Sequence, residues 1–442
     1  MIGWSGTRIV WAGSAGVAGA LAAVSDLAPH RVWGVAAALG YGAAAMLAGS
    51  HRRAAVGVAL LGAVAVPLVL LVATGRGQLE VAVVERSGAL LTATGVPYAR
   101  EPGGLADYNP YLPGMAVLGA LPGDPRWWTG AVFVASVAAV GASPRVAGWV
   151  VACPLVALPL AVGGVDLPVA GLMCLGLTLA GRGRAGRAGL ALGAAAALKW
   201  TAWPAVLVAL ALLVAVGRRP CRVGLGRWGE CGHAVAAVTA GGWWRGPSGL
   251  TSSRPAALGT TKGARPLPPT SAGATLHGPA PVVRRPSAGG WLRPVLRCLG
   301  AAAGVVGAVS LPVLVNPGAF YQHVVAFPLG LTGTESPAAS PFPGRLLAAY
   351  VPGGAVVAGV LLGVSAVLVA VSLAVRPPST VRAAARRLAL GLTLAIAFMP
   401  ASRFGYLVIP FVLLTCLRET PCTVRSSSPT TSRPGRAASR RS

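Results

Sequence analysis

The chain has 442 residues, of which 55% are hydrophobic and only 11% are charged. That balance excludes the two or three soluble domains that this length would otherwise suggest. The formal net charge of +27 would indicate a nucleic-acid partner in a soluble protein, but most arginines here occupy short loops and two polar segments. Positive residues in such places hold loops in the cytoplasm and meet anionic membrane lipids, so we expect no nucleic acid to bind.

Long uncharged runs recur along the chain and predict an all-α polytopic membrane protein. Residues 54–74 and 353–375 can each cross roughly 30 Å of hydrocarbon as a helix whose backbone hydrogen bonds are satisfied internally. Helices too short for a full crossing also occur, and with them we expect about ten to twelve crossings. In chain order the expected helices lie near 9–25, 32–49, 54–74, 111–121 (short), 127–143, 146–163 and 167–181, then as short pairs within 188–216 and 387–416.

Arginine-rich loops assign the two sides of the membrane. Basic residues cluster at 51–53, at 182–187, after Gly217, at 376–387 and after Leu417, where the positive-inside rule places the cytoplasm. The sides were assigned from basic residues alone, and most acidic residues then fall on the outer side. Any carboxylate chemistry is therefore expected at the extracytoplasmic face of a plasma membrane. The acidic residues that fall on this outer side are Asp26, Glu80, Glu85, Glu101, Asp107, Asp124, Asp166 and Glu335.

The same threading divides the chain into four regions. Two are transmembrane parts, and two are rich in Arg, Pro, Gly and Ser without sustained periodicity, which is typical of disorder. The regions are an N-terminal transmembrane part at 1–216 with an outer loop at 75–110, a disordered basic cytoplasmic insertion at 217–296, a C-terminal transmembrane part at 297–416 with an outer loop at 316–352, and a disordered basic cytoplasmic tail at 417–442.

The stretch GQLEVAVVERSG at 77–88 places two carboxylates just after a predicted span. Its pattern of apolar and small residues suits a helix that lies along the membrane. Glu80 and Glu85 are five residues apart, about 140° around a helix, so they do not form a facing pair. We expect one of them to take a proton and the other to orient the loop.

Other outer elements supply candidate substrate contacts. DYNPYLPG at 107–114 makes a rigid, amphipathic lead into the short helix, and Asp166 follows a flexible glycine pair at the outer end of a span. Each has a simpler alternative: aromatic and proline residues are common at any interface, Asp166 could cap its helix, and a lone histidine is more often structural. The candidate substrate-binding residues are Asp107, Tyr108, Asn109, Asp166 and His323.

Several cations share the outer face with these acids. Lys199 lies between two apolar helices, which is costly unless its ammonium reaches water or an anion; snorkelling is the alternative. Arg86, Arg345 and Arg403 lie at outer loops or turns. Cations beside a carboxylate and apolar grooves suit a lipid-linked phosphate with a general base, and they suit an anion transporter equally. Nothing in the sequence calls for a metal or a cofactor, and a DxD-type cluster is missing.

Four stretches resemble the membrane-embedded GT-C glycosyltransferases, most of all family 87 and its actinobacterial polyprenol-phosphate-mannose-dependent mannosyltransferases. With the surrounding spans they cover most of 9–216 and 297–416, whereas the insertion has no counterpart. The stretches are EVAVVERSGALLTATGVPYA leading into DYNPYLPG, DLPVAG followed by GRGRAGRAGLALGAAAALKWTAWPA, NPGAFYQHVVAFPLGLTG with SPAASPFPG, and SRFGYLVIP.

The resemblance implies a GT-C bundle that transfers a hexose, with mannose favoured, from a polyprenyl-phosphate donor to a glycolipid, glycan or glycoprotein acceptor with inversion. The family's acidic base, usually Asp, falls at or near Glu80, with Glu85 as the alternative. The family's basic residues match Lys199 and Arg345, which the resemblance would place on the donor phosphate; we add Arg403 and Arg86 as further candidates. Membrane lipids are the remaining expected partner.

Two other function classes stay open. A transporter or flippase for a lipid-linked or anionic solute is favoured by the short paired helices at 188–216 and 387–416. A non-catalytic scaffold would use the two glutamates only to mark an outer loop. An enzyme requires Glu80 or Glu85 to line a cavity shared with Lys199, Arg345 or Arg403, a transporter requires a through-path near the midplane, and a scaffold requires neither.

Overall fold

The computed structural model describes residues 4–218, 290–334 and 337–417, and most of these residues are helical. No β-strand occurs within these ranges, and Ala339 and Ser402 form an isolated bridge. The prediction of an all-α protein is confirmed. Glu335 and nearly all of the predicted tail and of the predicted insertion lie outside the described residues.

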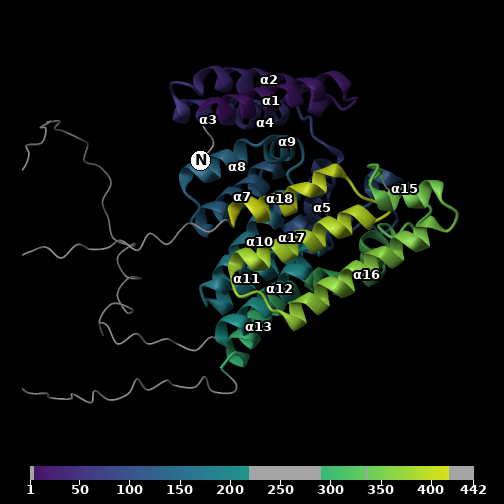
Figure 1. Cartoon of the computed structure of the whole chain (residues 1–442). Helices are drawn as coiled ribbons and strands as arrows, with labels where there is room; N and C mark the ends of the chain where they lie inside the picture. The colour runs from purple at the N-terminus through teal and green to yellow at the C-terminus, as the bar shows by residue number, and fades with distance from the viewer. Residues whose placement is uncertain (1–3, 219–289, 335–336, 418–442) are drawn as a thin grey trace, which may run out of the picture. The chain divides into compact units, whose positions relative to one another are not determined.

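The first helices form one layer at the N-terminal end of the chain (Figure 1). They are α1 (Trp4–Val24), α2 (Ala28–Leu47) and one long helix made of α3 (Arg52–Leu60), the π-helical turn η1 (Leu61–Ala65) and α4 (Val66–Ala73). A π-helical turn disturbs the regular hydrogen-bond ladder, and the buried indole N–H of Trp33 donates to the carbonyl of Ala63 at 2.8 Å.

The next segment carries α5 (Leu79–Thr94), the short turn η2 (Leu105–Asp107) and α6 (Pro113–Gly119), followed by α7 (Pro125–Val140). The predicted span at 146–163 is two helices, α8 (Pro144–Ala152) and α9 (Pro154–Val162), bent by 68°. Cys153 is extended between them because the residue before a proline avoids helical geometry. The hydroxyl of Tyr41 donates to the carbonyl of Ala152 at this break, at 2.6 Å.

The centre of the described part is α10 (Asp166–Gly181), which is buried along nearly its whole length. It packs against α7 and against α11 (Ala185–Leu198) and α12 (Trp203–Gly217). Lys199 and the turn η3 (Trp200–Ala202) separate α11 from α12. The predicted pair of short helices within 188–216 is therefore confirmed, with Lys199 at its turn.

The C-terminal part starts with α13 (Leu292–Ser310), which packs on α11. The start of α13 corrects the predicted boundary of the disordered insertion at 296, because the apolar pattern of this helix begins four residues earlier. The remaining elements are η4 (Leu311–Leu314), α14 (Pro317–Phe320), η5 (Tyr321–Ala326), α15 (Pro343–Tyr350), α16 (Gly354–Val375), α17 (Val381–Phe398), η6 (Phe404–Leu407) and α18 (Val408–Cys416).

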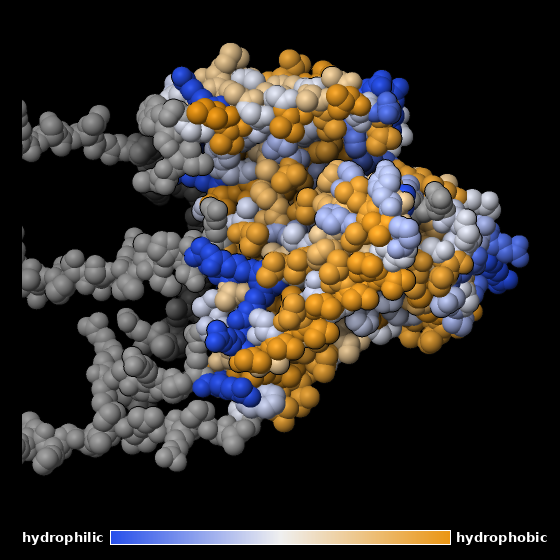
Figure 2. Space-filling model, turned by 45° about the vertical axis from the view of Figure 1, so that its right-hand side comes forward, coloured by the Kyte–Doolittle hydropathy of each residue, from blue (hydrophilic) through white to orange (hydrophobic). Residues whose placement is uncertain are grey.

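Five helical stretches of the described residues are long and apolar enough to cross a membrane, or six if the bent α8–α9 pair is one span. The predicted ten to twelve crossings are not confirmed. Helices such as α10 and α11, with 16 and 14 residues, reach only about 24 and 21 Å at 1.5 Å per residue. Figure 2 shows the broad hydrophobic band that the helices present, with hydrophilic side chains gathered toward its edges.

Successive helices place their connecting turns at two ends of this helical unit. Contacts at one end join the turns near residues 30, 78, 163, 199 and 403, and we call it the Glu80 end. Contacts at the other end bring Arg182 to Val140 and Val381 to Gly181, and we call it the Arg182 end. The turns at the Arg182 end include two of the arginine-rich loops, those at 182–187 and 376–387.

Candidate functional site

Glu80 owes its position to a sharp reversal between α4 and α5. Gly75 has φ +62, a backbone conformation that glycine adopts without strain, and the backbone N–H of Gln78 donates to the carbonyl of Val162 at 2.8 Å. α5 begins directly after Gln78, so Glu80 lies in its first turn, where the helix dipole favours a carboxylate.

The carboxylate of Glu80 forms an ion pair with the guanidinium of Arg403, 323 residues further along the chain. Arg403 lies in the turn between α17 and α18, directly before η6. The pair is mostly enclosed, because the side chains of Glu80 and Arg403 are 16% and 31% exposed. The structure thus joins the predicted base to one of the predicted phosphate ligands.

A second ion pair joins two more of the predicted residues. The ammonium Nζ of Lys199 lies 2.6 Å from Oδ1 of Asp166, and the two side chains are 12% and 11% exposed. Asp166 occupies the first turn of α10, and Lys199 occupies the break between α11 and η3. Nζ of Lys199 also lies 4.4 Å from the ring centre of Tyr406 and 5.7 Å from that of Tyr111.

The two ion pairs belong to one site, which we call the double ion-pair site: Glu80, Arg403, Asp166 and Lys199, with Tyr111 and Tyr406. Tyr406 follows Arg403 by three residues and touches Lys199, so it links the pairs. Burial lowers the pKa of Lys199, but the charge of Asp166, its hydrogen bond to Lys199 and the charge of Glu80 act in the opposite direction, and that pKa is raised. Lys199 therefore carries its charge at neutral pH.

Tyr111 contributes a buried aromatic ring to this site, and its phenol stays neutral. Burial raises its pKa well above the usual value, the nearby charges of Glu80 and Asp166 raise it further, and Arg403 opposes them. Nζ of Lys199 lies over the Tyr111 ring, which places this phenol beside the pair that Lys199 forms with Asp166. Two acids against two bases leave the site close to neutral as it stands.

Glu85 lies elsewhere on α5 and does not join this site. Its carboxyl group is near the ion pair of Asp124 and Arg126, and partial burial, together with the charge of Asp124, raises its pKa against the opposing effect of Arg126. Arg126 is buried, bonds both oxygens of Asp124 at 2.9 and 2.6 Å, and donates to the carbonyls of Arg76 and Ala161. This arginine holds the base of α5 against α9.

Arg86 and Asp107, predicted to bind phosphate and substrate, form an ion pair with each other at 3.7 Å. Arg86 also donates to the carbonyl of Ala106, and Asp107 accepts from the backbone N–H groups of Gly103 and Gly104 at 3.0 and 3.1 Å. Both side chains are more than a third exposed. The structure uses them to fasten the loop at 95–112 to α5.

Tyr108, Asn109 and His323 connect this loop to η5. His323 is fully buried: its Nδ1 accepts from the backbone N–H of Asn109 at 3.0 Å, and its Nε2 donates to the carbonyl of Ala99 at 2.8 Å. The ring of Tyr108 stacks on Phe327 with centres 4.3 Å apart. Because both nitrogens of His323 are occupied by backbone groups, its contacts are those of a positioning residue.

The loop delivers Tyr111 to the double ion-pair site. The side-chain oxygen of Asn109 accepts from the backbone N–H of Tyr111 at 3.1 Å, and the N–H of Leu112 donates to the carbonyl of Leu198, next to Lys199, at 3.2 Å. Arg345 is exposed on α15 and has no ion pair with a described residue. The structure therefore does not bring Arg345 to the site through any described contact.

Sequence reasoning missed one more contact of this site. Nε2 of His30, in the first turn of α2, lies 2.6 Å from the amide nitrogen of Gln78, two residues before Glu80. The sequence did contain a signal for this contact, because His30 and Gln78 lie in two turns that are both predicted on the outer side. Within the described ranges, no group of three or more His, Cys, Asp or Glu is placed to hold a metal ion.

Comparison with models of protein families, with curated proteins and with solved structures found no match for this chain.

Proposed function

We propose that this chain is an inverting glycosyltransferase of GT-C type, which moves a hexose, with mannose favoured, from a polyprenyl-phosphate donor to a glycolipid, glycan or glycoprotein acceptor. The observation that supports the proposal is the meeting of Glu80 with Arg403 beside Lys199 at one end of a helical membrane protein. The meeting of these charges supports an enzyme of this kind, because a scaffold would not require it.

The chemistry assigns a separate task to each charge. Arg403 and Lys199 would hold the donor phosphate, because cations bind phosphate oxygens with strong, charge-assisted hydrogen bonds. The phosphate would then compete with Glu80 for Arg403, leaving the Glu80 carboxylate free to accept a proton from the acceptor hydroxyl. The hydroxyl oxygen attacks the sugar carbon, the bond from that carbon to the phosphate oxygen breaks, and polyprenyl phosphate leaves from the opposite face.

Substitution of the two glutamates tests this proposal. Radiolabelled polyprenyl-phosphate-mannose is supplied to membranes that contain wild type, Glu80→Gln or Glu85→Gln, together with a panel of acceptors. Glu80→Gln should lower the rate of transfer about 10²- to 10⁴-fold, the usual contribution of a general base. Glu85→Gln should retain transfer, because Glu85 lies outside the double ion-pair site.

The matched control is Glu101→Gln, which removes an exposed carboxylate from the same loop region. Membrane insertion and detergent-extracted yield of each variant are compared with those of wild type. Loss of transfer in Glu85→Gln with Glu80→Gln active would move the base to Glu85. No transfer by wild type with any acceptor would overturn the glycosyltransferase.

A transporter or flippase for a lipid-linked or anionic solute is the second candidate. The observation that favours it is the matching pair of interrupted helices, α11–α12 broken at Lys199 and α17–α18 broken near Arg403. Broken helices in two halves are typical of transporter binding sites. Movement of a fluorescent polyprenyl phosphate across vesicles, lost in Arg403→Gln and without sugar transfer, would support this function.

A further inference from the structure

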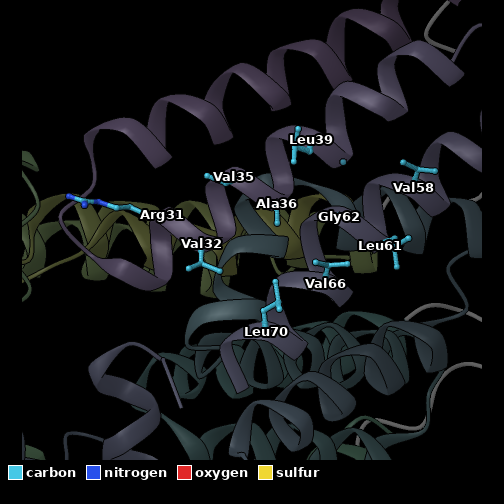
Figure 3. A pocket seen from close by; sticks show the side chains of 11 residues that line it. Arg31, Val32, Val35, Ala36, Leu39, Val58, Leu61, Gly62, Val66 and Leu70 are labelled. Carbon is cyan, nitrogen blue, oxygen red and sulfur yellow. The ribbon is translucent and has the colours of Figure 1, made fainter. Parts of the chain in front are cut away.

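An apolar groove lies between α2 and the α3–η1–α4 helix, away from the double ion-pair site. It has a volume of about 690 Å³. Figure 3 labels most of the residues that line it, and the most exposed apolar ones are Val35, Leu39, Leu61 and Leu70, which are 56%, 72%, 58% and 48% exposed. Both walls belong to apolar helices, and the α3–η1–α4 helix is long and apolar enough to cross the membrane.

The floor of the groove is backbone rather than side chain. At the crossing of α2 with η1, a Cβ added to Gly40 would lie only 2.7 Å from the Cα of Gly62. The two helices therefore touch through glycine, and the bulky side chains stand on either side of that contact. The indole N–H of Trp33 donates to the carbonyl of Ala63 and so helps to hold the π-helical turn in place.

Among the residues that line the groove, Arg31 alone is charged, and it lies at one end while Val58 and Leu61 lie toward the other (Figure 3). Its Nε donates to the carbonyl of Ser25 at 2.6 Å, which leaves the two outer nitrogens for other partners. One of them is 3.9 Å from the fully exposed carboxylate of Asp26. Such an exposed, long pair contributes little, so an anion can take over the guanidinium.

Arg31 extends from a different face of α2 than the face that is turned toward the double ion-pair site. His30 points to Gln78 and so to the turn that carries Glu80. The next residue along a helix points about 100° away, and Arg31 lines the groove. A lipid in the groove would therefore not occupy the double ion-pair site, which favours a resident lipid over a reacting one.

We propose that this groove binds an anionic phospholipid, with one acyl chain along the apolar walls and the phosphate on Arg31. A guanidinium recognises phosphate oxygens in a forked geometry, and a groove within a membrane protein is filled by lipid chains. The bound lipid would brace α2 against α4 and, through His30 and Gln78, the turn that holds Glu80. The site does not depend on the proposed glycosyl transfer.

Native mass spectrometry of the delipidated full-length protein tests the site. The protein is mixed with equal amounts of phosphatidylglycerol and phosphatidylcholine, and the bound fraction of each is measured. Wild type should retain one phosphatidylglycerol in preference to phosphatidylcholine, and Arg31→Gln should weaken this retention about tenfold, equivalent to about 1.4 kcal/mol. Ala36→Trp, which fills the groove, should weaken retention of both lipids.

Two matched variants control for general effects. Arg53→Gln removes an exposed charge from the opposite end of the same pair of helices, and Ala366→Trp adds the same bulk to the exposed side of α16. Both should bind phosphatidylglycerol as wild type does. Equal retention of the two lipids by wild type, or equal loss in Arg53→Gln and Arg31→Gln, would overturn the proposal.

Two competitors separate the sources of phosphate. Farnesyl phosphate that displaces phosphatidylglycerol at equal concentration would show that the groove prefers a single isoprenoid chain, and would overturn the choice of a phospholipid. Inorganic phosphate that displaces it as effectively would show that the apolar groove contributes nothing. Neither result depends on sugar transfer, so failure here is distinguishable from failure of the proposed enzyme.

Discussion

His323 illustrates how a single buried residue can be read differently in sequence and in structure. A histidine in a loop rich in Pro and Gly suggested a substrate contact. In the structure its ring bonds to the backbone of both Asn109 and Ala99. It therefore fastens its own segment to a loop more than two hundred residues earlier in the chain. Burial is the main cause that lowers its pKa, with a smaller contribution from the charge of Arg86, while the bond to Ala99 and the charge of Asp107 oppose this.

The lowered pKa of His323 predicts that acid destabilises the protein. The unfolded chain takes up a proton near the usual value of about 6.5, whereas the folded protein resists it. The stabilisation is therefore complete above about pH 6.5 and is lost as pH falls through the lower folded pKa, with a limiting slope of about 1.4 kcal/mol per pH unit. Apparent melting temperatures of wild type and His323→Gln are measured in detergent from about pH 7.5 to about pH 5.

Glutamine offers one donor and one acceptor and does not titrate, so it is the matched replacement. The melting temperature of wild type should fall more steeply with acid than that of His323→Gln. Parallel curves would show that the proton is taken up elsewhere. If His323 bound substrate and stabilised nothing, the melting temperatures of wild type and of His323→Gln would depend on pH in the same way.

The helix that carries Glu80 depends on a close approach between α5 and α6. A Cβ added to Gly88 would meet the backbone of Gly119, and one added to Gly119 would meet the backbone of Val84. Neither neighbour can yield as a flexible side chain would. The position of Glu80 relative to Arg403 therefore depends on a glycine eight residues away, at the middle of α5.

Gly88→Ala should displace α5 and reduce both stability and activity. Overpacking of this kind costs about 1–3 kcal/mol, so the apparent melting temperature should fall by several degrees. The displacement should also reduce sugar transfer by at least about tenfold, because small misplacements of catalytic groups are costly. Both are measured on detergent-solubilised protein and on membranes.

Gly130→Ala on α7 is the matched control, because a Cβ there meets nothing within 4 Å. It should melt at or above the temperature of wild type, since alanine favours a helix more than glycine. A Gly88→Ala variant that melts as Gly130→Ala does would show that α5 can move away from α6 without cost.

For the whole molecule, the central question is which end of the helical unit faces outward. The arginine-rich turns lie at the Arg182 end, and the double ion-pair site lies at the other. The positive-inside rule then predicts that Glu80 faces outward, which is the side on which the proposed polyprenyl-phosphate sugar would be used.

Labelling of single introduced cysteines tests this orientation. Arg100→Cys, in the exposed loop after α5, should react with a membrane-impermeant maleimide on intact cells. Arg187→Cys, exposed near the start of α11, should react only after the cells are permeabilised. The unsubstituted protein measures the background from native cysteines. The reverse pattern would place the site in the cytoplasm and exclude the proposed donor orientation.

The sequence was sufficient for most of the helical plan, because apolar runs and their arginine-rich ends follow from the cost of placing charge in hydrocarbon. It predicted α1, α2 and α16, the short helix α6, and the turns at Lys199 and Arg403. The predicted number of crossings is not confirmed, because an apolar pattern shows where a helix is but not whether α10 or α11 is long enough to span the membrane. Sequence reasoning also missed the break at Cys153, although Pro154 was its signal.

The sequence by itself was sufficient to indicate a helical membrane protein, and it predicted that most of its scarce carboxylates lie on one side of the membrane. Only the tertiary structure decided that Glu80 rather than Glu85 meets Arg403, that Asp166 pairs with Lys199, and that Arg86, Asp107 and His323 fasten a loop. Hydropathy is a local property that each segment carries alone. Pairing of charges hundreds of residues apart depends on how α5, α10, α11 and the turn before α18 pack, and no segment contains that information.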